Sequence, residues 1–376
     1  MRTDICDRLG IEFPIFAFSH CRDVVAAVSR AGGFGVLGAL AFGPEQLEIE
    51  LDWIDEHVDG KPYGVDLVIP AKFVTSGEGD RDLGIKKIQE MISDEHWAFV
   101  EQLLSEHEVP PLPPDADNTP VAAGLEAGER FPRQVELVLR HENVKMLVNA
   151  LGPMPAYAAD AAHEKGVDVG ALVGSVRHAE LNMANGVDVL IAQGTEAGGH
   201  CGEISTMVLV PDVVDAAGDR AAVLAAGGIG DGRQVAAALA LGAQGAWTGS
   251  IWLTVAEAQT TPVVVENLLA ATSRDTVRSR AMTGKPARQL RTDWTEAWES
   301  PESPGYLPMP LQGILFADAS RRITRVQNKE LSGSPVGQIV GRMNKVRPAK
   351  DVIFDLVEES IEASERLSEY MGAAGE

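Results

Sequence analysis

Short apolar stretches alternate with amphipathic stretches along most of the chain. Eight of the apolar stretches are rich in Val, Ile, Leu and Phe, and most are apolar throughout rather than at every second position. Strands that are buried on both faces of a parallel sheet have this pattern. It therefore predicts eight strands, over residues 13–19, 34–40, 63–69, 144–150, 167–174, 187–193, 221–227 and 244–253.

The stretches between these strands repeat their apolar positions with helical spacing. They predict helices over residues 23–32, 44–58, 155–166, 176–186 and 231–242. Strand–helix repeats over about 250 residues have the size of an α/β fold of the (β/α)8 TIM-barrel type. A doubly wound open sheet is the alternative, because periodicity cannot show whether a sheet closes.

Two segments interrupt the repeat. Residues 71–133 are longer than an ordinary βα loop and include a proline-rich stretch, so they predict an insertion after the third strand and a candidate lid. Residues 256–376 contain helical patterns over 263–272 and 351–371. We therefore expect a barrel over 1–255 and a mainly helical appendage over 256–376, whose last helix packs back on the barrel.

Composition and charge narrow the class of protein. The 376 residues carry 32 Lys and Arg against 55 Asp and Glu, a net charge of −23 that disfavours nucleic acid and anionic membranes as partners. The three cysteines, Cys6, Cys21 and Cys201, have no paired or metal-binding spacing, so we expect reduced thiols, no metal site and a cytoplasmic location. No apolar run approaches the roughly 20 residues that span a bilayer.

The sixth predicted strand runs into a glycine-rich loop that carries one histidine, in the stretch AQGTEAGGH (192–200). The active sites of such barrels are built from loops at the carboxyl ends of the strands. Gly194, Gly198 and Gly199 lack a Cβ, so this loop can turn sharply and approach a flat ligand. His200 can exchange a proton near neutral pH, as an acid–base catalyst must. A structural histidine bound to a loop carbonyl is the alternative.

Two more glycine-rich turns follow the last two predicted strands. One contains Gly227 and Gly228, and the other contains Thr248, Gly249 and Ser250. In barrels of this kind, the loops after strands seven and eight frequently bind phosphate through backbone N–H groups. We therefore expect a phosphorylated cofactor such as FMN at these turns. Two tight turns without a ligand are the alternative, because glycine is common in turns.

Weaker candidates come from the first and third strands. Ser19, His20 and Cys21 end the first apolar stretch and form a candidate wall of the active site, although a helix-capping role suits Ser19 equally well. Asp66 lies within the third stretch, where an isolated carboxylate is costly unless it is hydrogen-bonded or turned towards a polar site. A strand-end residue that reaches solvent is the alternative for Asp66.

The segments VDVLIAQGTEAGGH (187–200) and VLAAGGIGDGRQVAAALALGAQGAWTGS (223–250) resemble the nitronate monooxygenase (2-nitropropane dioxygenase-like) family of FMN-dependent TIM-barrel oxidoreductases. Residues 13–40 and 334–353 also resemble segments of this family. The resemblance implies oxidation of alkyl nitronates or nitroalkanes by O2 to a carbonyl compound and nitrite, with His200 as the base. It also implies that the residues that contact the FMN are Asp66, Gln193, Gly198, Gly199, Gly227, Gly228, Trp247, Thr248, Gly249 and Ser250.

Two positions depart from the family pattern. The family usually has Ala-Pro-Met at the end of the first strand, where this chain has the stretch Ala17–Cys21, and it usually has an asparagine at the position of Asp66. These differences leave a second enzyme class open, an NAD(P)H-dependent flavin reductase or dehydrogenase that acts on an enoyl or CoA thioester or a quinone. A protein that binds flavin without catalysis is a third hypothesis, for which His200 would have no purpose.

Overall fold

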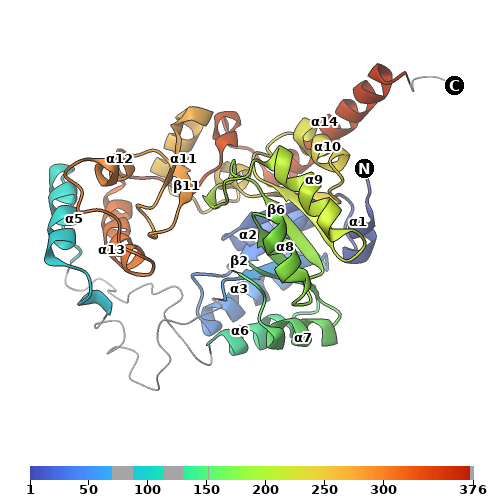
Figure 1. The fold of residues 1–376 in the computed structure, drawn as a ribbon, viewed down its shortest axis with the longest axis horizontal. Helices are drawn as coiled ribbons and strands as arrows, with labels where there is room; N and C mark the ends of the chain where they lie inside the picture. The colour runs from blue at the N-terminus through green and yellow to red at the C-terminus, as the bar shows by residue number, and fades with distance from the viewer. Residues whose placement is uncertain (70–87, 114–129, 151, 373–376) are drawn as a thin grey trace.

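Eight parallel strands close into a barrel in a computed structural model, which describes residues 1–69, 88–113, 130–150 and 152–372 (Figure 1). All eight predicted strands are confirmed, and the closed order decides against an open sheet. The barrel strands are β1 (Ile15–Ser19), β2 (Phe34–Gly38), β3 (Tyr63–Leu67), β4 (Val144–Asn149), β5 (Asp168–Val173), β6 (Val189–Gln193), β8 (Ala222–Ala226) and β9 (Gly245–Thr248).

The eighth strand is shorter than the sequence predicts. It ends at Thr248, and the apolar residues that follow form a 3-10 helix, η1 (Ser250–Thr254). Gly249 leaves the extended conformation, with φ −130° and ψ −60°, and the indole N–H of Trp252 turns back to Thr248. Ser250 therefore begins a short helix at the carboxyl end of β9.

A ring of helices covers the barrel. It comprises α2 (Arg22–Arg30), α3 (Pro44–His57), α6 (Arg130–Val138), α7 (Ala156–Glu164), α8 (Val176–Met183), α9 (Thr206–Ala217) and α10 (Gly232–Ala240). The helical pattern did not predict α9, which contains Pro211. Helix α6 packs against α3 and α7, so the end of the predicted 71–133 insertion belongs to the barrel.

Apolar side chains fill the barrel, and one end is closed. Phe16, Phe34, Met146, Ile191 and Leu224 belong to one buried cluster inside the strands. The first helix, α1 (Asp4–Leu9), adds its own apolar residues to that cluster, and the segment before it bonds the chain just ahead of β9. Because α1 blocks the amino ends of the strands, polar side chains inside the barrel can reach a ligand only at the carboxyl ends, which we call the mouth.

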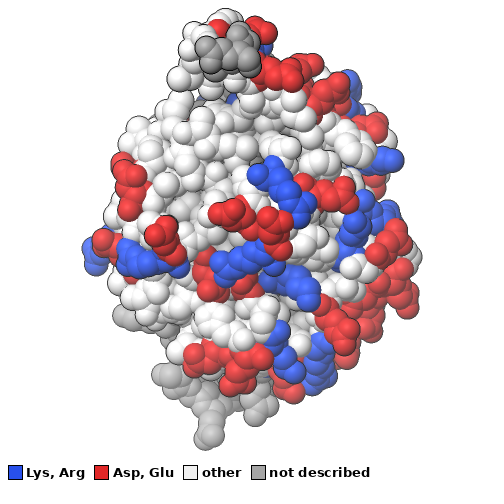
Figure 2. Space-filling model, turned by 90° about the vertical axis from the view of Figure 1, so that its right-hand side faces the viewer, with Lys and Arg blue, Asp and Glu red and all other residues white. Residues whose placement is uncertain are grey.

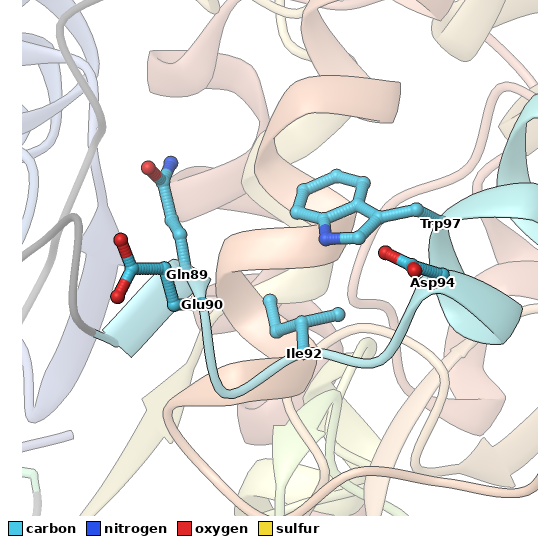
Figure 3. Close-up of a pocket in the computed structure, with 5 residues that line it drawn as sticks. All are labelled: Gln89, Glu90, Ile92, Asp94 and Trp97. Carbon is cyan, nitrogen blue, oxygen red and sulfur yellow. The ribbon is translucent and has the colours of Figure 1, made fainter.

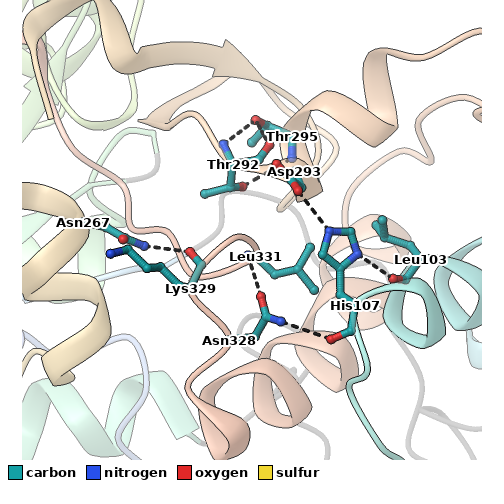
Figure 4. A network of polar contacts seen from close by, with 9 residues as sticks. All are labelled: Leu103, His107, Asn267, Thr292, Asp293, Thr295, Asn328, Lys329 and Leu331. Atoms are coloured by element: carbon teal, nitrogen blue, oxygen red, sulfur yellow. Dashed lines mark hydrogen bonds and ion pairs between the residues drawn. The ribbon is translucent and has the colours of Figure 1, made fainter. Parts of the chain in front are cut away.

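The described part of the insertion packs with the appendage in a second core, whose helices lie on the left of Figure 1. These helices are α5 (Asp94–Glu106), α12 (Asp293–Glu299) and α13 (Leu311–Val326). A polar network joins them: His107 Nε2 lies 3.0 Å from Asp293 Oδ2, and the amide of Asn328 donates to the carbonyl of His107 at 3.1 Å (Figure 4). The rest of the predicted lid, over 70–87 and 114–129, lies outside the described residues.

The appendage also returns to the barrel. Strands β10 (Thr276–Ser279) and β11 (Ala287–Leu290) form a small sheet with β7 (Gly199–His200), so the appendage is not only helical. The last helix, α14 (Ala349–Tyr370), packs against α10 and α2. The remaining elements are α11 (Pro262–Ala270), η2 (Ser273–Asp275) and η3 (Gln338–Arg342).

On the face that Figure 2 shows, acidic and basic side chains alternate, with uncharged surface between them. Among the described residues, no helix combines the length and the apolar character that crossing a bilayer would require.

We expect Gly35→Ala to destabilise the barrel by about 1–3 kcal/mol, as overpacking a full core does. A Cβ at Gly35 would lie 2.8 Å from Val25 Cα, and both positions are buried between β2 and α2. Gly43→Ala is the matched control, because its Cβ would meet no described atom closer than 4.0 Å. Urea unfolding should separate the two variants, and equal midpoints would contradict this packing.

Candidate functional site

His200 lies on β7, where it pairs with Ala287 of β11. Its Nδ1 is 3.2 Å from the carbonyl oxygen of Pro286. Because a carbonyl only accepts, Nδ1 carries the hydrogen and Nε2 keeps a lone pair. The ring is exposed, yet partial desolvation lowers its pKa below the ordinary 6.5; the Pro286 carbonyl opposes this shift and Lys285 adds to it. His200 is therefore a neutral imidazole at neutral pH.

Thr206, at the start of α9, holds the histidine loop against the turn after β8. Its Oγ1 lies 2.8 Å from the Glu196 carboxylate and 2.9 Å from the carbonyl oxygen of Gly227, and its amide donates to Glu196 at 3.0 Å. A Cβ on Gly194 would lie 2.6 Å from Thr206 Cα, so this close approach requires glycine. Glu196 already occupies the amino end of α9, which is therefore not available to a ligand.

A segment from late in the chain completes this packing. The amide of Gly337 donates to Ser250 Oγ at 2.8 Å, and the amide of Gln338 donates to the carbonyl of Glu196 at 2.9 Å. A Cβ on Gly198 would lie 2.8 Å from the nitrogen of Gly337. Gly337 thus joins the histidine loop to the turn after β9. Sequence reasoning did not select Gly337, and its only signal was the resemblance of residues 334–353 to a family segment.

The two predicted phosphate turns lie on neighbouring strands, β8 and β9. Gly227 and Gly228 have φ values of 100° and 70°, a left-handed conformation that suits glycine. Within the described part of the chain, no hydrogen bond engages the amides of Gly228, Gly249 or Ser250. A Cβ on Gly249 would meet no described atom within 4 Å. These turns therefore leave backbone donors available to an anion, with open space beside Gly249, whereas Gly228 packs against the Glu196 side chain.

The hydroxyls of the second turn are already engaged. Thr248 Oγ1 donates to the carbonyl of Phe16 at 2.8 Å and accepts from the indole N–H of Trp252 at 2.9 Å. Ser250 Oγ accepts from Gly337. Thr248 lies within β9 and has used its hydroxyl hydrogen, whereas Ser250 keeps both its amide and its O–H to donate to a ligand.

The inner wall of the mouth combines aromatic and polar side chains. Trp247 is stacked against Phe16 and against Phe18, with ring centroids 6.4 and 6.2 Å away. Gln193 follows Val189 and Ile191 with the strand period of two and is partly exposed at the mouth. Asp66 is only 3% exposed, and its Oδ1 has no partner among the described residues.

The three residues of the candidate wall, 19–21, have different surroundings in the structure. His20 is exposed, with its Nδ1 2.8 Å from the carbonyl of Gly38 and its ring edge-on to Phe18. Ser19 Oγ accepts from the amide of Cys21 at 3.1 Å, a turn that precedes α2. Cys21 instead packs in the core between strands and helices, and its thiol lies 3.2 Å from the carbonyl of Glu257. His20 is therefore the exposed member of this group at the mouth.

Two arginines that sequence reasoning missed hold the histidine loop from the other side. Arg288 is 8% exposed, and its Nε donates to the carbonyl of Thr195 at 2.9 Å. Arg278 lies opposite it on β10 and reaches the carbonyl of Cys201 at 3.5 Å. No sequence pattern marked either residue, because their contacts depend on the pairing of β11 with β7.

A separate open hollow of about 470 Å³ lies beside α5 (Figure 3). It is lined by Gln89, Glu90, Ile92, Asp94 and Trp97, which come from one short stretch of the insertion. It contains none of the predicted site residues. We therefore place the candidate site at the barrel mouth, where several segments distant in sequence converge.

A closed parallel barrel with a histidine loop and glycine-rich turns at the carboxyl ends of its strands is the arrangement of a TIM-barrel enzyme. The sequence model of the nitronate monooxygenase family matches residues 3–359. The putative monooxygenase Rv1533 of Mycobacterium tuberculosis is 50% identical over 369 residues, which cover 96% of this chain and 97% of that protein. The chain therefore belongs to the nitronate monooxygenase family, whose members are flavoproteins, and the protein is an oxidoreductase.

Solved structures agree with this fold. FabK from Thermotoga maritima is 28% identical, with a TM-score of 0.73 and coverage of 98% of this chain and 99% of that one. The nitroalkane oxidase from Streptomyces ansochromogenes is 24% identical, with a TM-score of 0.79 and coverage of 97% and 99%. At 24% identity, the second likeness concerns the fold.

Gly337→Ala should reduce flavin retention at least several-fold. Its backbone angles suit alanine, but a Cβ would lie 2.7 Å from the carbonyl oxygen of Glu196 and would push the histidine loop away from Ser250. Gly313→Ala on α13 is the control, since its Cβ would meet no described atom closer than 3.9 Å. The ratio of flavin to protein after gel filtration measures the effect. Equal ratios in both variants would show that Gly337 does not support the site.

Proposed function

We propose that the mouth binds FMN, with the phosphate at the amides of Gly228, Gly249 and Ser250. Three donors without a partner among the described residues and the open space at Gly249 suit an anionic group. The ring would lie against Trp247 and Gln193, which line the inner wall. The residues at the mouth therefore fit the cofactor class of the family.

We further propose that the enzyme oxidises alkyl nitronates, or the nitroalkanes that give rise to them, with O2 to a carbonyl compound and nitrite. The observation that carries this proposal is His200, a neutral imidazole that donates from Nδ1 and has a free lone pair on Nε2. When bound, the flavin supplies electron transfer between the substrate and O2. The substrate carbon next to the nitro group is acidic, so one well-placed base suffices to start the reaction.

The chain's own residues prepare and stabilise the proton transfer. Nε2 of His200 takes the α-proton, and the carbonyl of Pro286 then faces an imidazolium that it stabilises through Nδ1–H. Lys285 lies next in the chain to Pro286, and its positive charge favours both the neutral base and an anionic nitronate. The contacts of Arg288 and Thr206 fix the loop that carries the base.

His200→Ala should lower kcat/KM for a neutral nitroalkane by about 10²–10⁴-fold, the usual contribution of an acid–base group. With preformed nitronate the loss should be much smaller, because no proton needs to be removed. Oxygen consumption and nitrite release measure both rates. A flavin content equal to that of the unmodified protein is the control, and an unchanged rate with nitroalkane would remove the base assignment.

The pH dependence follows from the depressed pKa of His200. A base works in its deprotonated form, so kcat/KM for nitroalkane should rise with pH through the pKa of His200 and then level off. Desolvation lowers that pKa, so this acid limb should lie below 6.5. It should be absent with preformed nitronate. A limb above 6.5, or one that persists in His200→Ala, would contradict the assignment.

Anaerobic mixing with NADH separates the oxidase reaction from the reductase alternative. We expect the bound flavin to stay oxidised with NADH and to be reduced by nitronate, as followed by its visible absorbance. Rapid bleaching by NADH together with turnover of an enoyl thioester or quinone would favour the flavin reductase instead. Flavin binding without turnover of any of these substrates would support a catalytically silent protein.

A further inference from the structure

The carboxyl group of Asp66 has no role in the proton transfer described above, and its surroundings are unusual for an acid. Asp66 lies on β3, 3% exposed, within the wall of the barrel. Its Oδ1 is buried and finds no hydrogen-bond partner among the described residues. Buried polar atoms in folded proteins nearly always have a partner, so a group bound at the mouth is a candidate for it.

No cation compensates this carboxyl within the described residues that flank it. Gly38 of β2 and Val148 of β4 are its neighbours in the sheet. Strand β2 carries no titratable side chain, and β4 carries only Lys145, which is exposed. At the mouth, His20 is engaged with the carbonyl of Gly38. An ionised carboxylate here would therefore be buried without a counter-charge among the described residues, which is strongly unfavourable.

Burial penalises the charged form of a carboxyl group much more than its neutral form. It raises the pKa of Asp66 well above its ordinary value, and the amide of Ala150 opposes that shift only in part. A neutral carboxylic acid has one O–H donor, whereas a carboxylate can only accept. The protonation state thus decides what Asp66 offers to a ligand at the mouth.

We propose that Asp66 is held as a neutral carboxylic acid and donates a hydrogen bond to an acceptor atom on the ring of the bound flavin. This inference rests on the proposed function, and it assigns Asp66 a positioning role without placing a negative charge against the ring. The donor would resemble a side-chain amide in what it offers, so Asp66→Asn is the conservative variant. Asp66→Leu has a similar size and cannot donate.

Infrared spectroscopy of the flavin-free protein tests the protonation state directly. We expect the carbonyl stretching band of a neutral carboxylic acid at neutral pH, and we expect Asp66→Asn to lack that band. If the two spectra are the same in this region, the proposal is overturned. This measurement needs no flavin, so it stands even if the proposed function fails.

Fluorescence titration with FMN tests the donor role. We expect Asp66→Asn to keep the dissociation constant within about threefold and Asp66→Leu to raise it about five- to tenfold, the effect of one lost hydrogen bond. Equal weakening in both variants would overturn the donor role. A complete lack of FMN binding by the unmodified protein would instead overturn the proposed function.

Thermal unfolding of each variant shows whether it folds. If Asp66→Leu does not fold, the pH dependence of FMN affinity decides. A neutral Asp66 predicts the same dependence in the unmodified protein and in Asp66→Asn across the neutral range. An affinity that falls with rising pH only in the unmodified protein would show that Asp66 ionises there, and the proposal would be wrong.

Discussion

The close approach of the histidine loop to the start of α9 is the contact on which the candidate site depends. Gly194 lies so near Thr206 that a Cβ would come within 2.6 Å of its Cα, and the hydroxyl of Thr206 reaches both Glu196 and Gly227. These contacts therefore hold the loop, the helix and the turn after β8 together. A base whose position must be fixed to a fraction of an ångström needs this kind of support.

Backbone carbonyls and burial, and not ion pairs, set the protonation states of the candidate residues at the mouth. His20 and His200 each have Nδ1 near a carbonyl oxygen, which fixes the tautomer and leaves Nε2 free. Asp66 has no counter-charge among its described neighbours, so burial controls its protonation. The strongly negative net charge of the chain is carried elsewhere, on exposed carboxylates such as those of Figure 2.

The barrel could be predicted from the sequence because its strands are buried on both faces and therefore read as continuous apolar stretches. The limits of prediction are equally physical. Helix α9 could not be predicted because it contains Pro211, which usually interrupts a helix. The end of β9 could not be predicted because it depends on the conformation of Gly249. The second core joins residues 88–113 to residues far along the chain, and local periodicity carries no information about such pairing.

The same limit applies to the site. His200, Asp66 and the glycine-rich turns stand out in the sequence because strand ends and special backbone angles have local signals. Gly337 and Arg288 do not, since each acts by touching a loop distant in sequence. Cys21 was grouped with His20 by adjacency, yet neighbouring residues at a strand end face different layers.

A crystal structure of the protein with FMN and a nitronate would test the central claim most directly. We expect the phosphate at the amides of Gly228, Gly249 and Ser250, the ring against Trp247 and Asp66, and Nε2 of His200 facing the substrate carbon from which the proton is removed. Density for the cofactor at another place, or a His200 ring turned away from the substrate, would contradict it.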